Sequence, residues 1–289
     1  MDVLTVSGAR KAFRPVKALD GASFELRQGE LLALLGPNGA GKTTIIRAIA
    51  GRVRLDGGDI RLFGEPLTTG RTHPVLGIVP QEIALYPLMS ARENLEVFGA
   101  LQGLSRPELK KQIGWALDVT GLTDRAREPV STFSGGMRRR LNIACGIVHR
   151  PRVVLLDEPT VGVDPQSRDR IYDMLSTLTV EGVSLLLTTH HLEEAEARCS
   201  RTVIIDHGRV IAAGTLPELV DRTVGKDRLV TLRLLSGEVI SERMRDVARD
   251  LPPLLDKVRQ AGDTVDDVEV RGPSLQAVFI HLTGRELRE

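Results

Sequence analysis

The chain has 289 residues, and its 39 Lys and Arg are balanced by 38 Asp and Glu, which gives a formal net charge of +1. This balance argues against the basic surface of a nucleic-acid-binding protein and against a polybasic membrane anchor. Aromatic residues make up 3% of the chain, too few for base-stacking platforms, and no uncharged apolar run approaches the roughly 18 residues of a membrane-spanning helix.

The N-terminal part predicts strands that lead into a glycine-rich loop. Leu4–Arg27 is rich in strand formers, and the apolar run Leu31–Leu35 predicts a strand that is buried on both faces of a parallel sheet. A predicted helix over Thr44–Ala50 follows. Between them the chain matches the pattern G-x-x-x-x-G-K-[ST] with the residues Gly36, Pro37, Asn38, Gly39, Ala40, Gly41, Lys42, Thr43 and Thr44.

Such a loop between a strand and a helix predicts a site for nucleotide phosphates. The glycines let backbone N–H groups turn inward around an anion, and the helix N-terminus adds positive potential. We expect Lys42 to reach the β and γ phosphates and Thr43 to ligate Mg²⁺. The loop by itself is compatible with kinases, GTPases, helicases and transport ATPases.

Residues from about 86 to 130 predict a helical insert. Short strands over Ile60–Phe63 and Leu76–Val79 precede it. The segments Ser90–Glu93 and Ser105–Glu108 each match the capping box, in which a Ser and a Glu three residues later satisfy the first N–H groups of a helix. The second helix then carries an apolar stripe made of Leu109, Ile113, Ala116 and Leu117.

Helices and buried strands alternate in the next part of the chain. The predicted elements are a helix over Gly135–His149, a strand over Val153–Leu156, a helix capped by Asp164, and strands over Val183–Leu187 and Thr202–Ile205. This alternation is typical of an α/β core with a mostly parallel sheet.

Two adjacent carboxylates, Asp157 and Glu158, stand at the end of the predicted strand Val153–Leu156. A magnesium-bound phosphate requires an acid for the metal and an acid for water. We therefore predict that Asp157 belongs to the metal shell and that Glu158 orients the attacking water.

The segment Phe133-Ser134-Gly135-Gly136-Met137 opens a predicted helix between the glycine-rich loop and the acidic pair. In this position it resembles the signature loop of ATP-binding cassette (ABC) ATPases, usually written LSGGQ. Phe133 and Met137 depart from that pattern, whereas Ser134 and the glycine backbone at Gly135 and Gly136 match it. A signature loop at a helix N-terminus offers a second anion site.

Further segments resemble the remaining ABC motifs in the same order. Gln81 corresponds to the Q-loop glutamine, and His190, in Thr188-Thr189-His190, corresponds to the switch histidine. The stretch that ends at Asp164 resembles the D-loop. Phe13 resembles the aromatic residue that stacks on adenine, where the family commonly has Tyr.

The resemblance covers residues 1–225 and implies a P-loop NTPase core of ABC type with a helical insert and an N-terminal antiparallel β portion. It implies ATP and Mg²⁺ as cofactors, with Thr43, Gln81 and Asp157 at the metal. Hydrolysis of ATP would use Glu158, His190 and Gln81.

A small C-terminal α/β domain is predicted over residues 226–289. Its elements alternate as a strand, a helix, a strand and a helix over Leu229–Leu235, Arg243–Ala261, Thr264–Val270 and Ser274–Leu282. Every predicted catalytic residue lies upstream of it.

The family resemblance also implies an assembly. With a single phosphate loop and a single signature loop, two chains must pair so that each ATP lies between the two kinds of loop. The cassettes would power separate transmembrane permease subunits from the cytoplasmic face of a bacterial membrane. The C-terminal tail and the segment TTHHLEEAE resemble exporter subunits for drugs, lipids or polysaccharides. An importer ATPase, or a soluble ABC protein acting on nucleic acid or ribosomes, remains an alternative.

Two minor expectations concern residues outside these motifs. Cys145 and Cys199 are far apart in the sequence and form no C-x-x-C pattern, so we expect buried free thiols in a reducing compartment. The run Arg138, Arg139 and Arg140 after the signature loop predicts a solvated basic face.

Overall fold

The computed structural model describes residues 1–70, 73–225 and 227–284. The chain divides into two compact units, of which the first comprises residues 1–213 and the second begins at Gly214. A boundary of the ATPase domain near residue 225 stays a prediction. Within the described ranges, no helix combines the length and the apolar character needed to cross a bilayer.

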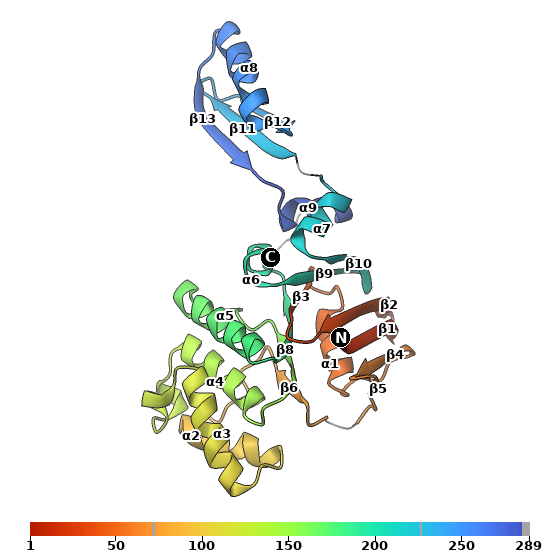
Figure 1. Ribbon diagram of the computed structural model, residues 1–289, viewed down its shortest axis with the longest axis vertical. Coiled ribbons are helices and arrows are strands. Elements are labelled where there is room, and N and C mark those ends of the chain that lie inside the picture. The colour runs from red at the N-terminus through yellow and green to blue at the C-terminus, as the bar shows by residue number, and fades with distance from the viewer. Residues whose placement is uncertain (71–72, 226, 285–289) are drawn as a thin grey trace. The chain divides into compact units, whose positions relative to one another are not determined.

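A six-stranded sheet forms the centre of the first unit (Figure 1). Its order is β10 (Arg209–Gly214), β9 (Arg201–Asp206), β3 (Leu31–Leu35), β8 (Ser184–Thr189), β7 (Val153–Asp157) and β6 (Leu76–Val79). The neighbours from β9 to β6 are parallel. Every residue of β3, β7 and β8 is buried, as expected when both faces of a sheet are covered. The predicted α/β core is confirmed.

An antiparallel sheet packs beside the parallel one. Its order is β2 (Val16–Arg27), β1 (Asp2–Phe13), β4 (Gly57–Leu62) and β5 (Glu65–Pro66). Apolar side chains such as Leu4 and Leu26 join Leu34 of β3 and Ile45 of the first helix in one buried cluster. The predicted antiparallel β portion is therefore part of the same hydrophobic core as the phosphate-loop strand.

The helices of the first unit are α1 (Lys42–Ile49), α2 (Ala91–Leu101), α3 (Arg106–Val119), α4 (Gly135–Ile147), α5 (Pro165–Val180) and α6 (Leu192–Arg198), with short 3₁₀ turns η1 (Thr123–Arg125) and η2 (Val130–Thr132). α1 begins two residues before its predicted start. α2 has the expected capping box, because Glu93 N donates to Ser90 Oγ at 3.2 Å and Ser90 N donates to the Glu93 carboxylate at 2.7 Å.

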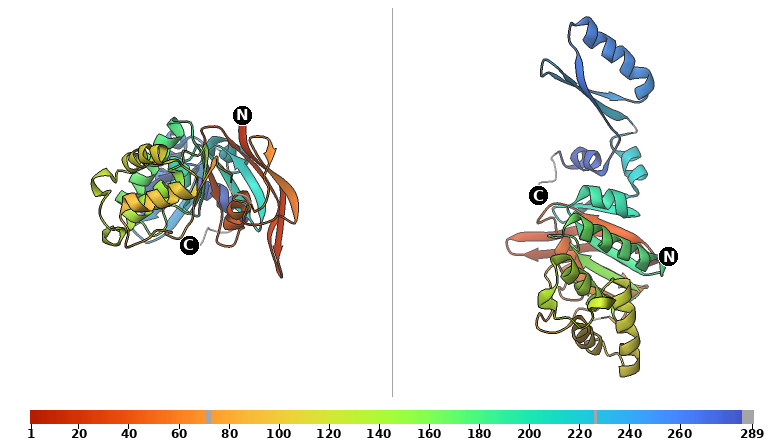
Figure 2. Two further views of the ribbon diagram at one scale, coloured as in Figure 1. Left: turned by 90° about the horizontal axis from the view of Figure 1, so that it is seen from below. Right: turned by 90° about the vertical axis from the view of Figure 1, so that its left-hand side faces the viewer.

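The helices of the insert, α2 and α3, pack against α4. Side chains of α2, α3 and α4, among them Leu95, Ile113 and Leu141, gather in a second buried cluster. Figure 2 shows in both views that the yellow α2 and α3 lie apart from the red strands β1 and β2. The insert and the antiparallel sheet therefore occupy different sides of the cassette.

The second unit contains α7 (Leu216–Arg222), β11 (Arg228–Leu234), β12 (Val239–Met244), α8 (Val247–Gln260), β13 (Val265–Arg271) and α9 (Leu275–Thr283). β12, β11 and β13 form an antiparallel sheet, and Val230, Leu232 and Leu234 of β11 pack with Leu254 and Val258 of α8.

The sequence prediction missed one strand in this unit. The predicted helix over Arg243–Ala261 is wrong at its start, because Arg243 belongs to β12 and α8 begins only at Val247, capped by Asp246. A turn at Gly237, with φ of 88°, brings β12 back against β11. Pairing across this turn overrides the local helical pattern.

Both cysteines are free thiols, as predicted, although only Cys145 is buried and Cys199 is half-buried. Burial raises the pKa of Cys199 to about 12, and burial also raises the pKa of the Cys145 thiol above its ordinary range. Since the thiolate is the reactive form of cysteine, both side chains are poor nucleophiles at neutral pH.

An ion network around the buried Arg201 guanidinium joins the two sheets of the first unit. Arg201 of β9 donates through Nε to Glu30 Oε1 at 2.8 Å and through Nη1 to Glu25 Oε1 at 2.9 Å. Its Nη2 also donates to the Glu25 carbonyl at 2.7 Å. Glu25 lies on β2, and Glu30 directly precedes β3. One guanidinium therefore connects the parallel sheet, the antiparallel sheet and the strand that leads to the phosphate loop.

Replacing Arg201 with Met should destabilise the fold by about 3–5 kcal/mol, because Glu30 would be left as a buried carboxylate without its cation. Urea unfolding of the full chain measures this loss. The matched control is Arg209→Met, since Arg209 of β10 pairs with Asp20 of β2 on an exposed surface, where such pairs contribute about 0–1 kcal/mol. Equal losses in the two variants would contradict the proposed role of burial.

Candidate nucleotide site

The glycine-rich loop connects the end of β3 to the start of α1 and lies tightly against its neighbours. A side chain at Gly36 would place its Cβ 2.2 Å from the Ile205 carbonyl oxygen, and one at Gly41 would place it 2.4 Å from the Ala18 carbonyl oxygen. Gly41 also has a φ of 106°, which strains residues with a Cβ. The loop can take this path only with glycine at both positions.

Lys42 is folded back into its own loop. Its Nζ donates to the carbonyl oxygens of Gly36 at 2.7 Å and Pro37 at 3.2 Å, and it lies 3.6 Å from Glu158 Oε1. The side chain is 5% exposed. Burial lowers the pKa of Lys42, and the nearby Glu158 charge opposes that shift. A desolvated ammonium in this position can exchange carbonyl oxygens for phosphate oxygens.

Glu158 occupies an uncommon backbone conformation directly after β7. Its φ is 48°, in the left-handed region that non-glycine residues seldom adopt. The Glu158 N–H donates to Thr188 Oγ1 at 2.9 Å, which supports the turn from the neighbouring strand β8. This conformation directs the carboxylate toward Lys42. Such strain costs on the order of 1–3 kcal/mol and is typical of functional sites.

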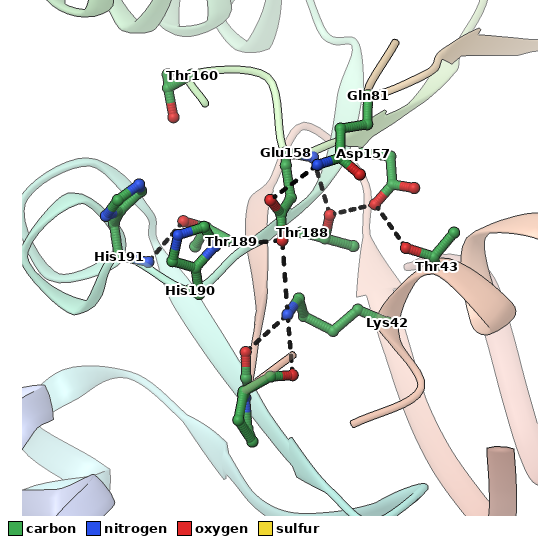
Figure 3. A network of polar contacts seen from close by, with 12 residues as sticks. Lys42, Thr43, Gln81, Asp157, Glu158, Thr160, Thr188, Thr189, His190 and His191 are labelled. Carbon is green, nitrogen blue, oxygen red and sulfur yellow. Dashed lines mark hydrogen bonds and ion pairs between the residues drawn. The ribbon is translucent and has the colours of Figure 1, made fainter. Parts of the chain in front are cut away.

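The Glu158 carboxylate is the point at which the polar side chains of the site converge (Figure 3). Gln81 Nε2 donates to its Oε2 at 3.4 Å, and His190 Nδ1 lies 3.2 Å from its Oε1. Together with Lys42, these contacts bring together residues that follow β3, β6, β7 and β8. The structure thus joins Lys42, Gln81, Glu158 and His190 in one cluster.

The residues beside this cluster fit a magnesium ion. Thr43 Oγ1 lies 3.4 Å from Asp157 Oδ1, which also accepts a 2.7 Å hydrogen bond from Thr188 Oγ1. Octahedral Mg²⁺ with oxygen ligands at 2.0–2.1 Å separates neighbouring ligands by about 3 Å. The described residues contain no group of three or more His, Cys, Asp or Glu that could hold a metal ion by itself. A hydroxyl and one carboxylate, completed by phosphate oxygens and water, are ligands of the kind that Mg²⁺ takes in nucleotide sites.

A cavity of about 490 Å³ opens in front of these groups. Val16 and Ala18 of β2 line one part of it, and the rest is lined by residues of the phosphate loop and the start of α1 together with Gln81, Glu158, Val161 and His190. Phe13 is not among the lining residues. The residue is 49% exposed, with Lys11 Nζ 5.4 Å from the ring centre. Contact of Phe13 with adenine stays a prediction.

Ser134, Gly135 and Gly136 lie outside this cavity. Ser134 caps α4, because its Oγ accepts a hydrogen bond from Met137 N at 3.2 Å. Gly136 packs so closely on α5 that an added Cβ would lie 2.2 Å from Ser167 Oγ. Asp164 in turn caps α5 by accepting a hydrogen bond from Ser167 N at 2.9 Å. The signature and D-loop segments are therefore neighbours of each other. The signature residues do not line the cavity of their own chain, whereas Val161, at the start of the D-loop segment, does.

The predicted solvated basic face after the signature loop is wrong for Arg139 and Arg140, which are buried, and holds only for the exposed Arg138. Arg139 Nη1 donates to the carbonyl oxygens of Gln81 at 2.7 Å and Pro80 at 3.3 Å. Arg140 donates to the carbonyl oxygen of Thr120. The physical reason is the helical period, because residues three and four positions after the buried Gly136 face inward.

Two contributors to the site were missed by sequence reasoning. Arg139 of α4 holds the backbone of Gln81, and its Nη2 lies 3.5 Å from the Val161 carbonyl oxygen beyond Glu158. Thr188 bridges the acidic pair through its hydroxyl. The signal for Thr188 was its place at the end of a buried strand, where a hydroxyl requires a partner.

Replacing Arg139 with Met should lower the free energy of unfolding by about 1–3 kcal/mol, because backbone carbonyl groups near Gln81 would lose their buried donor. Denaturant titration of the full chain measures the change. The neighbouring control Arg138→Met removes an exposed guanidinium and should stay within about 0.5 kcal/mol of the wild type. If both variants unfold at the same denaturant concentration, Arg139 does not hold the Gln81 segment.

Comparison with known proteins agrees with this geometry. A family model described as ABC transporter matches residues 19–161. The chain is 37% identical to the linearmycin resistance ATP-binding protein LnrL of Bacillus subtilis (strain 168), over 99% of this chain and 100% of that protein. It is 38% identical to the Nod factor export ATP-binding protein I of Ralstonia nicotianae, over 99% and 95%, and 36% identical to the daunorubicin resistance ATP-binding protein DrrA3 of Streptomyces coeruleorubidus, over 99% and 97%.

Solved structures show the same fold. An ATP-binding subunit of an ABC transporter matches with a TM-score of 0.68 and 30% identity, over 76% of this chain and 92% of that chain. The protein cbiO1 from Clostridium perfringens, part of the ABC transporter complex cbiONQ, matches with a TM-score of 0.69 and 26% identity, over 76% and 95%. The chain therefore belongs to the ABC transporter family, among its ATP-binding subunits.

Proposed function

We propose that this chain is the ATP-hydrolysing subunit of a bacterial exporter of drugs, lipids or polysaccharides. The convergence of Lys42, Gln81 and His190 on the Glu158 carboxylate carries the hydrolytic part of this proposal. The export part is supported by relatives that match nearly the whole chain and whose names refer to drug resistance or to Nod factor export.

Each group of the cluster has a role that its position supports. Lys42 would pair with the β and γ phosphates in place of the carbonyl oxygens of Gly36 and Pro37. Glu158 would accept a hydrogen bond from the attacking water, and His190 would donate to the γ phosphate. Thr43, Asp157 and Gln81 would hold Mg²⁺, which when bound neutralises charge on the phosphate oxygens.

The position of the signature loop supports a paired assembly. Ser134 and Gly135 are exposed at the N-terminus of α4 and lie outside the cavity of their own chain. Backbone N–H groups at a helix N-terminus favour anions. A second cassette would therefore complete each site by placing its own Ser134 against the γ phosphate, so that the bound nucleotide joins the two chains.

A groove between the core and the insert is the surface that we assign to the permease. It has a volume of about 180 Å³ and is lined by residues that include Ile78 of β6, Phe98 of α2 and Asn142 of α4. Several large apolar residues that are close in sequence to the lining residues are exposed, namely Ile83, Tyr86, Leu88 and Leu101. Exposed apolar groups of this kind are typical of protein interfaces. Docking there would place the cassette at the cytoplasmic face of the membrane.

Glu158→Gln should slow hydrolysis strongly while ATP still binds. The amide keeps the size of the side chain but cannot accept a proton from water, so kcat should fall by about two to four orders of magnitude. Steady-state phosphate release and equilibrium binding of labelled ATP, measured on the same preparation, separate the two effects.

Lys42→Ala is the comparison variant. It removes a cation from the phosphates, so the affinity for ATP should fall together with turnover. Wild-type turnover in Glu158→Gln would remove Glu158 from its role, and unchanged ATP affinity in Lys42→Ala would show that Lys42 does not reach the phosphates.

A further inference from the structure

A polar cluster around the buried Glu194 carboxylate connects the loops that carry Glu158 and His190. It consists of Thr160, Arg168, Tyr172 and Glu194. We propose that this cluster is a positioning device that fixes the Glu158 carboxylate relative to His190 and thereby sets the rate of the hydrolytic step. The inference rests on the proposed ATPase function, and none of the four residues touches the nucleotide cavity.

The Glu194 carboxylate is the centre of the cluster. Its Oε2 accepts hydrogen bonds from Thr160 Oγ1 and from Tyr172 OH, each at 2.7 Å. Its Oε1 lies 3.0 Å from Arg168 Nη1. Thr160, Tyr172 and Glu194 are all buried. Two neutral donors and one cation therefore surround a single desolvated carboxylate.

The cluster ties together segments that carry the reacting groups. Thr160 follows Glu158 with only Pro159 between them (Figure 3), and the ring of a proline fixes its φ. Glu194 lies in the first turn of α6, four residues after His190. A displacement of Thr160 therefore also displaces Glu158, and a displacement of Glu194 also displaces His190.

The helix α5 contributes two of the four side chains of the cluster. Arg168 and Tyr172 lie one turn apart on α5, and Arg168 Nη2 also lies 3.5 Å from the Val163 carbonyl oxygen. The N-cap of this helix is Asp164, the residue of the predicted D-loop. The cluster thus connects three segments, which are the loop after β7, the start of α6 and the N-terminal part of α5.

Packing alone does not account for a carboxylate in this place. Apolar residues of similar volume commonly replace a buried ion pair without loss of stability, whereas directed hydrogen bonds fix the position of each partner. Burial and the Glu194 charge raise the pKa of the Tyr172 hydroxyl, so Tyr172 stays a donor at neutral pH. The left-handed backbone at Glu158 also requires supporting contacts on both sides. Thr188 supplies one of these contacts, and the Glu194 cluster supplies the other through Thr160.

Two substitutions at Thr160 separate positioning from packing. Thr160→Val keeps the shape of the side chain and removes the hydroxyl, whereas Thr160→Ser keeps the hydroxyl and removes a methyl group. We expect kcat to fall about tenfold in Thr160→Val, since small displacements of a reacting group have effects of this order or larger, and to stay near the wild-type value in Thr160→Ser. The affinity for labelled ATP should change by less than about twofold in both variants, because neither substitution removes a contact with the bound nucleotide.

Tyr172→Phe provides a second variant from another segment. It removes one hydroxyl from the same carboxylate oxygen and should lower kcat to a similar extent at unchanged ATP affinity. The control is Thr177→Val, because Thr177 is exposed on α5 and donates only to the Asp173 carbonyl oxygen of its own helix. Its kcat should equal that of the wild type.

Hydrogen exchange gives a readout that does not depend on turnover. Thr160→Val should raise the amide hydrogen-exchange rates of residues 190–195 several-fold, because that segment loses a hydrogen bond that restrains its local opening. The substitution itself lies in a different segment. Thr177→Val should leave that exchange unchanged. If the wild-type chain hydrolyses no ATP, the proposed function fails, and exchange still shows whether the two loops are coupled.

Either of two results would overturn the inference. One is a reversed order of kcat values, with Thr160→Val as active as the wild type and Thr160→Ser impaired. A packing role of Thr160 predicts that order. The other is unchanged exchange over residues 190–195 in both Thr160→Val and Tyr172→Phe.

Discussion

The candidate site depends on buried parallel strands that end at the same edge of one sheet. In the pairing of β3 with β8, Leu35 lies opposite Thr189, and in that of β7 with β8, Asp157 lies opposite Thr188. The phosphate loop, the acidic pair and the histidine loop therefore leave the sheet side by side. Because side chains alternate between the faces of a strand, a slip of one residue would turn Asp157 away from Thr43.

The polar groups at this edge of the sheet are hydrogen-bond and ion-pair partners of one another before a nucleotide binds. Lys42 uses the carbonyl oxygens of its own loop and the Glu158 charge as partners, so its burial does not leave an unpaired cation. Glu158 in turn contacts Gln81 and His190. A bound triphosphate can replace these internal contacts with stronger ones. In our account it also connects this half of the site to the signature loop of a second chain.

Much of the core and of the site could be predicted because the relevant patterns are local. The buried runs at β3 and β7, the glycine pattern around Lys42 and the capping Ser90 each depend on a few neighbouring residues. What sequence reasoning missed depends on contacts with other segments of the chain. The guanidinium of Arg139 donates to the Gln81 carbonyl oxygen, 58 residues away in the sequence, and β12 forms by pairing with β11 across the turn at Gly237. The residues around Arg139 or within β12 alone do not contain that information.

In the proposed paired assembly, each nucleotide site contains Lys42 of one chain and Ser134 of another. The most direct test mixes equal amounts of a chain carrying Lys42→Ala and a chain carrying Ser134→Arg, each expected to be inactive alone, and measures ATP hydrolysis. A mixed pair holds one site with both defects and one site with neither, so activity should return, to about a quarter of the wild-type rate for random pairing of two-fold dimers. Hydrolysis at the wild-type rate by the Ser134→Arg chain alone would contradict the claim.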